Sequence, residues 1–298
     1  MDRYVYKRGK HQQDLLKAII LYCVPTAVLT LVFQLIPIGM AVVYSFMKIN
    51  LMSGTNTFIG FDNVKRLFND ARFLHSIGVT IKYFLLRVPL QMFVGFLLAL
   101  LIYQPKRFTA ALRTVILLPA VTSMAVVTSI LALMMHPSNG LINSLLALIS
   151  IAPQGFLTDP EQALFSIVLI TVWKNVGMTM LFFLAGLMAI SPTLYEAAVI
   201  DGASSLQKHW HVTIPMLQKT ILFILITTTI RSFQVFGPIL MTTNGGPLDS
   251  TRVVVMDIYE NAFVFNQLGY ASTQSVLLAL FLIVISFIQS KASGRSRT

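Results

Sequence analysis

Six long apolar segments dominate the sequence and leave little material for a water-soluble core. They lie at about 16–46, 77–103, 110–135, 163–189, 216–240 and 271–290. Only 11% of the 298 residues are charged, against about a quarter in soluble domains. Because about 20 apolar residues in a helix cross a bilayer, the sequence predicts an all-α membrane protein with six transmembrane helices. Pro25 and Pro37 interrupt the first segment, which predicts a tilted helix or a kink near Pro37.

The distribution of Lys and Arg predicts the orientation of these spans. With the N-terminus in the cytoplasm, the inner segments would be 1–17, 104–113, 189–219 and 291–298. These segments hold thirteen of the 22 Lys and Arg residues, whereas the outer segments hold five. Basic residues are enriched on the cytoplasmic side of membrane proteins, so both termini are expected inside. We expect cytoplasmic tails at 1–15 and 291–298 on either side of a membrane domain at 16–290.

The net charge of +11 does not predict a nucleic-acid partner. The basic residues flank apolar runs instead of forming one stripe, so a role in setting the topology of the chain in membrane lipid explains them better. Cys23 is the only cysteine, and no Cys/His spacing suits zinc. The phosphate-binding pattern GxxxxGK[ST] is also missing. We therefore predict no metal site, no cofactor held by this chain and no ATP hydrolysis of its own.

Two polar segments are expected on the outer side. FDNVKRLFND, residues 61–70, alternates apolar and charged residues as a short amphipathic helix on the membrane surface does, although a plain solvated loop fits equally well. The segment 238–270 contains TNGGPLDST, which predicts a turn at Gly245, Gly246 and Pro247. The stretch DIYENAFVFNQ after it is periodic, so this segment is expected to be structured.

Apart from Lys17, Arg113 and Lys219 at the inner ends of their spans, four basic residues and no acidic ones fall within the predicted spans: Lys82, Arg87, Lys174 and Arg231. Ion-coupled transporters commonly use an intramembrane carboxylate. A secondary transporter is therefore disfavoured, although a sodium site built from carbonyl groups stays possible. Lys82 and Arg87 lie near the outer end of their span, where we expect the side chains to extend to the interface.

Lys174 lies near the middle of its span and cannot easily reach an interface. One interpretation is a polar path for a hydroxyl-rich solute, because buried cations usually face a bundle interior or a wet cavity. Its lining would be Trp173, Lys174, Asn175, Arg231 and Gln234. The alternative is that the basic groups pair with a neighbouring subunit or with backbone carbonyls.

The segment 191–215 is charged although it joins two apolar segments. Ser191 and Pro192 are typical of a helix start, Gly202 permits a bend, and ASSLQKHWHV can form a second short helix. The sequence predicts a helix–glycine–helix loop on the cytoplasmic side. Such a loop could dock into a groove on a partner protein, or it could merely connect two spans.

EAAVIDGAS and the later TIP in this loop resemble the EAA signature of binding-protein-dependent ABC importer permeases. The matches are Glu196, Ala197, Ala198, Gly202, Ile214 and Pro215, with TIP where many members have TLP or ALP. Asp201 and Ala203 around the glycine are similar to the carbohydrate branch of the family. NGGPLDST and LGYAS resemble segments near the last span of maltose-transporter MalF-type permeases. The chain lacks that subunit's additional spans and large insertion, so it is more similar to compact glycerol-3-phosphate and multiple-sugar permeases.

The resemblance implies the ABC type I importer permease fold, in a multi-pass protein of the bacterial plasma (inner) membrane. It also implies four kinds of partner: a second permease, two ATPase subunits that hold ATP and Mg, an extracytoplasmic sugar-binding protein and a sugar. The matched residues Glu196, Ala197, Ala198, Asp201, Gly202, Ala203, Ile214 and Pro215 would contact the ATPase. Asn244, Gly245, Gly246 and Pro247 would contact the binding protein. The implied function is a transport subunit, not an enzyme, and an acidic sugar or a glycerol phosphate is an alternative cargo.

Overall fold

The apolar segments form helices in the computed structural model, which describes residues 19–49, 54–103 and 109–294. Four helices are long and apolar enough to cross a membrane: Ile19–Ser45, Ala71–Tyr103, Ala163–Met188 and Leu268–Ala292. Two bent helix pairs, Thr109–Val121 with Met124–Met134 and Ser205–Met216 with Gln218–Phe233, raise the number to six if each pair is one span. The contacts divide the chain into two compact units, which are described separately.

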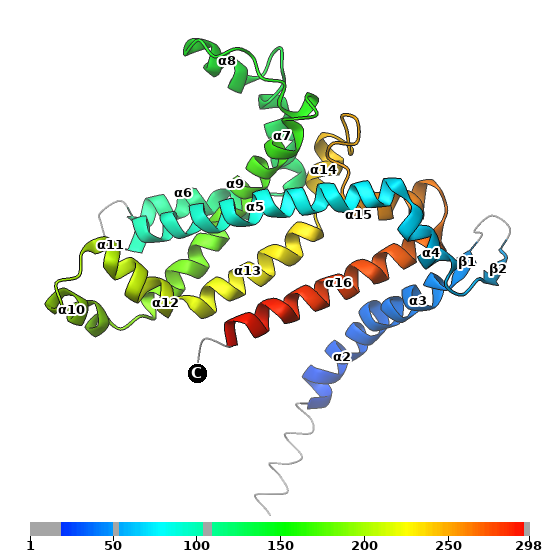
Figure 1. The fold of residues 1–298 in the computed structure, drawn as a ribbon, viewed down its shortest axis with the longest axis horizontal. Helices are drawn as coiled ribbons and strands as arrows, with labels where there is room; N and C mark the ends of the chain where they lie inside the picture. Colours follow the sequence, from blue (N-terminus) through cyan, green and yellow to red (C-terminus); the bar gives the residue numbers. More distant parts are fainter. Residues whose placement is uncertain (1–18, 50–53, 104–108, 295–298) are drawn as a thin grey trace, which may run out of the picture. The chain divides into compact units, whose positions relative to one another are not determined.

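The first unit comprises residues up to Phe68 and Asn261–Leu277. Its first span runs through η1 (Ile19–Cys23), α2 (Val24–Thr30), η2 (Leu31–Leu35) and α3 (Ile36–Ser45). The two strands β1 (Met47–Ile49) and β2 (Asn56–Phe58) and the helix α4 (Asp62–Asn69) follow. The unit closes with η5 (Glu260–Val264) and the start of α16 (Leu268–Gly294). These elements are visible in Figure 1.

The β1–β2 hairpin was not expected from the sequence. The strands are antiparallel, with Met47 opposite Phe58. Asn63 of α4 is buried, and its amide donates to the carbonyl oxygens of Ser45 and Met47 at 3.0 and 3.1 Å. The helix thereby fixes the chain as it leaves the span. Of the two interpretations of FDNVKRLFND, the helix is the one observed.

The second unit holds residues 69–260 and 278–298. Its long helices are α5 (Ala71–Tyr103), α6 (Thr109–Val121), α7 (Met124–Met134), α9 (Ala163–Met188) and α13 (Gln218–Phe233). The shorter elements are α8 (Leu141–Leu148), η3 (Phe156–Thr158), α10 (Pro192–Ile200), α11 (Ser205–Lys208), η4 (His209–Thr213), α12 (Ile214–Met216), α14 (Gly237–Thr242) and α15 (Val254–Tyr259). The end of α16 completes the unit.

Helix α9 is the centre of the second unit. Two thirds of its apolar window, 67%, is buried within the chain, against 33% for α5. One core cluster includes Tyr83, Ile167 and Ile239, and another includes Met180, Leu187 and Leu217. Gly177 lets α6 approach α9 closely, since a Cβ at this position would lie 2.5 Å from the carbonyl oxygen of Ile116. The apolar windows of the other long helices are mostly exposed, with 33%, 22% and 0% buried within the chain.

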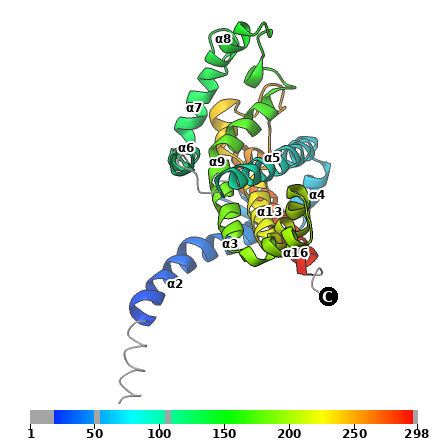
Figure 2. The same ribbon diagram turned by 90° about the vertical axis from the view of Figure 1, so that its left-hand side faces the viewer.

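Two expected spans are not straight helices. The segment 110–135 is bent by 100° between α6 and α7, and Figure 2 shows α7 leading away from α6 toward α8. The expected span 216–240 ends as a helix at Phe233, and Gly237–Thr242 is the separate helix α14. Gly237 and Pro238 explain the second interruption, because proline is tolerated in the first turn of a new helix but not in a helix interior.

Candidate functional site

The 191–215 loop forms the helix–glycine–helix arrangement that the sequence predicts. Pro192 opens α10, with Ser191 in an extended conformation before it. Gly202 has a φ of +76°, and the amides of Gly202 and Ala203 donate to the carbonyl oxygens of Val199 and Ala198 at 3.0 and 2.9 Å. This is the Schellman pattern that ends a helix with glycine in the left-handed conformation. The positive φ at this position therefore explains why the motif has a glycine here.

A second helical segment begins at once. Ser204 accepts from the amide of Gln207, whose side chain accepts from the amide of Ser204, so α11 opens with a capping box. The hydroxyl of Thr213, which is fully buried, then joins both halves of the loop. It lies 3.0 Å from the hydroxyl of Tyr195 in α10 and 3.2 Å from Nδ1 of His209 in η4.

The loop exposes a mixed acidic and apolar surface. Glu196, Val199 and Ile200 are three and four residues apart on α10, so they share one helix face, and the two aliphatic side chains are 58% and 86% exposed. Leu206 and Trp210 are 68% and 61% exposed in the second half. Among the described residues, Glu196 makes no ion pair or hydrogen bond. This surface has the composition of a protein contact.

The other motif residues lie around this surface. Ala197, Asp201, Gly202 and Pro215 are exposed, whereas Ala198, Ala203 and Ile214 are partly covered. Ile214 and Pro215 form α12 with Met216, and Leu217, which is fully buried, follows directly. A helical connection therefore leads from the loop into α13.

Lys174 contacts backbone carbonyls, which is the alternative raised from the sequence. Its Nζ donates to the oxygens of Pro119 and Ala120 at 3.3 and 3.2 Å. Those carbonyls belong to the last turn of α6, where no intrahelical partner is available, and a cation is favourable at a helix C-terminus. Lys174 thus stabilises the break between α6 and α7.

The remaining path candidates lie on α9 and at the end of α13. Trp173 is 50% exposed, next to the buried Lys174. Asn175 donates to the carbonyl of Thr171 at 2.7 Å. Arg231 and Gln234 are both exposed; Arg231 lies in the last turn of α13 and Gln234 directly follows the helix. Within the described part of the chain, no hydrogen bond or ion pair joins Trp173 or Asn175 of α9 to Arg231 or Gln234.

The expectation for Arg87 was wrong, whereas Lys82 is exposed as expected. Arg87 is only 4% exposed, and its Nη1 donates to Ser232 of α13 at 3.4 Å. The guanidinium also lies over the ring of Tyr83, 5.8 Å from its centre, whereas the buried Nε has no hydrogen-bond partner among the described residues. A buried intramembrane cation is a candidate for a functional residue. The position of Arg87 along the span could not reveal whether its side chain points to the interface or into the protein.

Two further side-chain hydrogen bonds join polar residues of neighbouring helices, and we call these buried polar groups the polar layer. Tyr83 of α5 donates to Thr171 of α9 at 2.9 Å. Gln91 of α5 donates to Thr179 of α9, also at 2.9 Å. The hydroxyl and amide groups of the apolar segments were the signal in the sequence for this layer.

The predicted turn at Asn244, Gly245, Gly246 and Pro247 is present and firmly held. Gly245 has a φ of +88°, and the hydroxyls of Thr243 and Thr251 lie 2.7 Å apart across the turn. Thr251 also donates to the carbonyl of Gly246 at 2.7 Å. We name residues 243–252 the glycine turn.

Charged residues missed by the sequence reasoning fix the end of the glycine turn. Glu260 binds two arginines, Arg252 and Arg72, and Arg252 also pairs with Asp249 at 2.8 Å. The side chains of Arg252 and Glu260 are 10% and 13% exposed. Burial opposes the charge of Arg252, but the hydrogen bonds to Asp249 and Glu260 outweigh it and raise the pKa of the guanidinium.

Metal ligands do not gather in the part of the chain that the structure describes. No group of three or more His, Cys, Asp and Glu side chains there could hold an ion. The features with a functional arrangement are the 191–215 loop, the polar groups of the spans and the glycine turn.

Residues 91–296, more than half of the chain, match the model of one protein family, "Binding-protein-dependent transport system inner membrane component". The chain belongs to this family. Two relatives agree with that assignment. The lactose transport system permease protein LacF of Rhizobium radiobacter is 37% identical over 92% of this chain and 93% of its own length. The sn-glycerol-3-phosphate transport system permease protein UgpA of Brucella suis biovar 1 is 35% identical over 89% and 90%.

Two solved structures have the same fold as this chain. A bacterial ABC transporter that imports the acidic polysaccharide alginate contains a chain that matches with a TM-score of 0.82 and 25% identity, over 97% of this chain and all of that one. The alginate transporter in complex with its alginate pentasaccharide-bound periplasmic protein matches with a TM-score of 0.81 and 26% identity, over 95% and 96%. The ABC importer permease fold and the family predicted from the EAA motif are confirmed, and the chain is an inner-membrane transport component, not an enzyme.

Proposed function

We propose that this chain is one permease subunit of an ATP-driven, binding-protein-dependent importer for a sugar or oligosaccharide. It would form half of the translocation pathway beside a second permease, receive its cargo from an extracytoplasmic binding protein and couple to two ATPase subunits. The proposed topology has six spans, a membrane domain at 16–290 and both termini in the cytoplasm. The relatives named for lactose and sn-glycerol-3-phosphate transport support a cargo of this chemical kind.

The observation that carries the proposal is the surface of the 191–215 loop, which we name the coupling loop. Glu196, Val199 and Ile200 expose one acidic and two aliphatic groups on a single face. A cytoplasmic segment gains nothing by exposing such groups to water, so a protein partner is expected there. In the proposed mechanism the ATPase binds this face, and its ATP-driven movement passes through α12 into α13.

The importer assignment is tested with the assembled transporter in proteoliposomes. We expect the chain to co-purify with its ATPase subunits. We also expect sugar uptake to require ATP on the side of the membrane where the ATPase subunits lie. A variant of the ATPase that binds but does not hydrolyse ATP serves as the control. Uptake that persists without ATP, together with no co-purification, would instead identify a secondary transporter.

An acidic cargo is a second candidate, and one observation favours it. Arg231 is exposed on α13 and has no acidic partner among the described residues, so it is available to a carboxylate or phosphate group. With Trp173, Asn175 and Gln234 it would face the solute. Lys174 would join them only if its bonds to the α6 carbonyls were released during transport.

Replacing Arg231 with alanine tests this second candidate. Loss of one charge-assisted contact is expected to lower uptake of an acidic sugar by about tenfold and uptake of a neutral sugar much less. Radiolabelled uptake of both sugars gives the measurement, with Lys82→Ala as a matched change at another exposed intramembrane cation. Equal losses for both sugars would contradict recognition of charge.

A further inference from the structure

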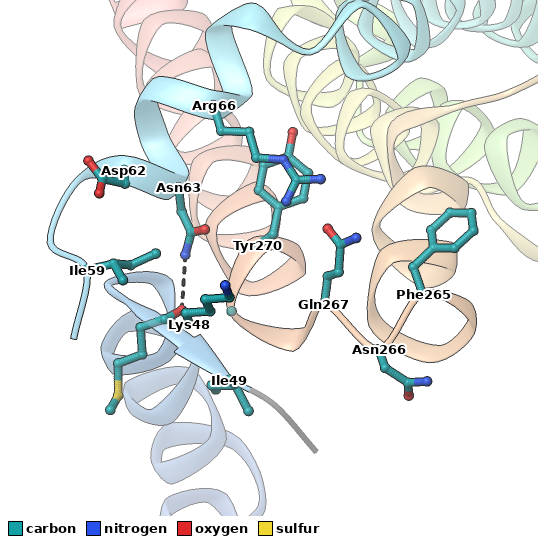
Figure 3. A pocket seen from close by; sticks show the side chains of 12 residues that line it. Lys48, Ile49, Ile59, Asp62, Asn63, Arg66, Phe265, Asn266, Gln267 and Tyr270 are labelled. Carbon is teal, nitrogen blue, oxygen red and sulfur yellow. Dashed lines mark hydrogen bonds between the residues drawn. The ribbon is translucent and has the colours of Figure 1, made fainter. Parts of the chain in front are cut away.

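A polar pocket in the first unit is not used by the proposed transport mechanism. It has a volume of about 560 Å³, within the range of about 300–1,000 Å³ found for small-ligand sites. Twelve residues of the hairpin, α4 and the segment before α16 line it: Met47, Lys48, Ile49, Ile59, Asp62, Asn63, Arg66, Phe265, Asn266, Gln267, Gly269 and Tyr270. Figure 3 shows the side chains around this hairpin pocket.

The pocket lies at the membrane boundary. β1 begins two residues after the span Ile19–Ser45, and the last span begins at Leu268, directly after Gln267. The hydroxyl of Thr273 donates to the carbonyl of Ser45 at 3.0 Å, so these span ends lie at the same membrane face. The pocket is therefore at the depth of lipid headgroups, whichever face that is. Phe265, which is 46% exposed, adds an aromatic group of the kind found at this interface.

The frame of the pocket is rigid. Asn63 binds the carbonyls of Ser45 and Met47. Gly269 lets the start of α16 touch the hairpin, because a Cβ there would lie 2.0 Å from the carbonyl oxygen of Met47. A pocket held by backbone contacts from three elements keeps its shape without a ligand.

The electrostatics of the hairpin pocket favour an anion. The guanidinium of Arg66 lies 4.0 Å from the ring centre of Tyr270, which holds it over the pocket. Neither Arg66 nor Lys48 has an acidic partner among the described residues. Asp62, the one acidic residue in the lining, is paired with Lys65 at 3.4 Å.

The pocket also offers a hydrogen-bond acceptor. The side-chain oxygen of Gln267 is buried and has no partner among the described residues. A buried polar atom without a partner is unfavourable, so a hydroxyl donor from a ligand would satisfy it. The ligand thus combines an anionic phosphate-like group with hydroxyl groups and is available at the membrane surface.

We propose that the hairpin pocket binds the headgroup of an anionic phospholipid of the phosphatidylglycerol type. Arg66 and Lys48 contact the phosphate, and the oxygen of Gln267 accepts from a glycerol hydroxyl. The acyl chains lie beside the apolar surface of the first span, where residues such as Phe33 are 72% exposed. Bound lipid then ties the start of the last span to the hairpin.

Native mass spectrometry of the assembled, delipidated transporter tests this proposal. We expect phosphatidylglycerol to bind about tenfold more tightly than phosphatidylcholine with the same acyl chains, since basic groups at a membrane surface discriminate headgroup charge. Arg66→Ala should weaken phosphatidylglycerol binding about fivefold, and the double variant with Lys48→Ala about 30-fold. Lys82→Ala, which removes an exposed cation of α5 outside the lining, should change it less than twofold.

Further variants and probes separate the outcomes. Arg66→Lys keeps the charge and should restore most of the binding, which distinguishes charge from the stacking on Tyr270. Equal affinities for the two lipids, or an equal effect of Lys82→Ala and Arg66→Ala, would overturn the proposal. So would displacement of the lipid by millimolar inorganic phosphate, which would identify a free-phosphate site. Unchanged lipid binding with a weakened binding-protein affinity would make the pocket a protein contact and would also overturn it.

Discussion

Replacing Glu196 with lysine is expected to lower ATP-driven uptake by at least about 30-fold, the effect of removing one member of a desolvated charge pair at an interface. Glu196 is exposed on α10 and makes no ion pair among the described residues. The substitution should therefore leave folding and membrane insertion intact and act on ATPase docking alone. The measurement is the affinity of purified ATPase subunits for membranes that contain the variant, together with sugar uptake.

The matched control for this prediction is Glu161→Lys, which makes the same charge change at another exposed acid. It should leave ATPase affinity unchanged. Normal ATPase affinity and normal uptake with Glu196→Lys would contradict the proposed role of the coupling loop.

Two substitutions of Gly202 distinguish an effect on ATPase docking from an effect on the geometry of the coupling loop. Its φ of +76° disfavours other residues, yet no atom lies within 4 Å of a Cβ built there. Asparagine tolerates this conformation, so Gly202→Asn should preserve the loop. Gly202→Val should distort it and lower uptake, because the left-handed conformation costs an ordinary residue about 1–2 kcal/mol and a β-branched one more. If asparagine is as harmful as valine, the partner packs directly against Gly202.

Replacing Glu260 with alanine is expected to have the second large effect, on the glycine turn. Arg252 would keep only Asp249, whose side chain is 50% exposed, and Arg72 would keep Asp257 at 3.6 Å. Breaking a mostly buried ion pair costs about 3–5 kcal/mol. The remaining partners and the 37% exposure of Arg72 lower the expected cost to about 2–3 kcal/mol.

Hydrogen exchange gives the direct measurement for Glu260→Ala. The amides of residues 243–252 should exchange faster, and the affinity for the binding protein should fall if the glycine turn contacts it. Asp249→Asn, which removes only the more exposed partner, should cost less than about 1 kcal/mol. Unchanged protection of the glycine turn in Glu260→Ala would show that the threonine and backbone bonds suffice to hold it.

The sequence predicted the helical membrane architecture well because length and apolarity decide it. It predicted the 191–215 loop equally well, since Pro192, Gly202 and Pro215 each restrict the backbone locally. Those signals depend on neighbours in the sequence and need no knowledge of packing. The glycine turn at Gly245 belongs to the same class.

Directions and interruptions within the spans were not predictable in this way. The bend between α6 and α7 is stabilised by Lys174, which comes from a helix more than fifty positions later. Arg87 lies at a position from which an interface was within reach, but Ser232 of α13 draws it inward. The hairpin depends on Asn63 in the same manner. In each case the deciding partner is distant in the sequence.

The buried hydroxyl of Thr213 has a consequence for the efficiency of the transporter. Its hydrogen bonds connect α10 to η4, so they restrain the two halves of the coupling loop although Gly202 separates them. A flexible loop would deform when the ATPase subunits move, so that ATP could be hydrolysed without movement of the membrane helices. Under the proposed coupling, a loop held by these hydrogen bonds would pass more of each ATPase movement to the membrane helices than a flexible loop would. Thr213 would therefore influence the amount of ATP used per sugar without contacting ATP or the sugar.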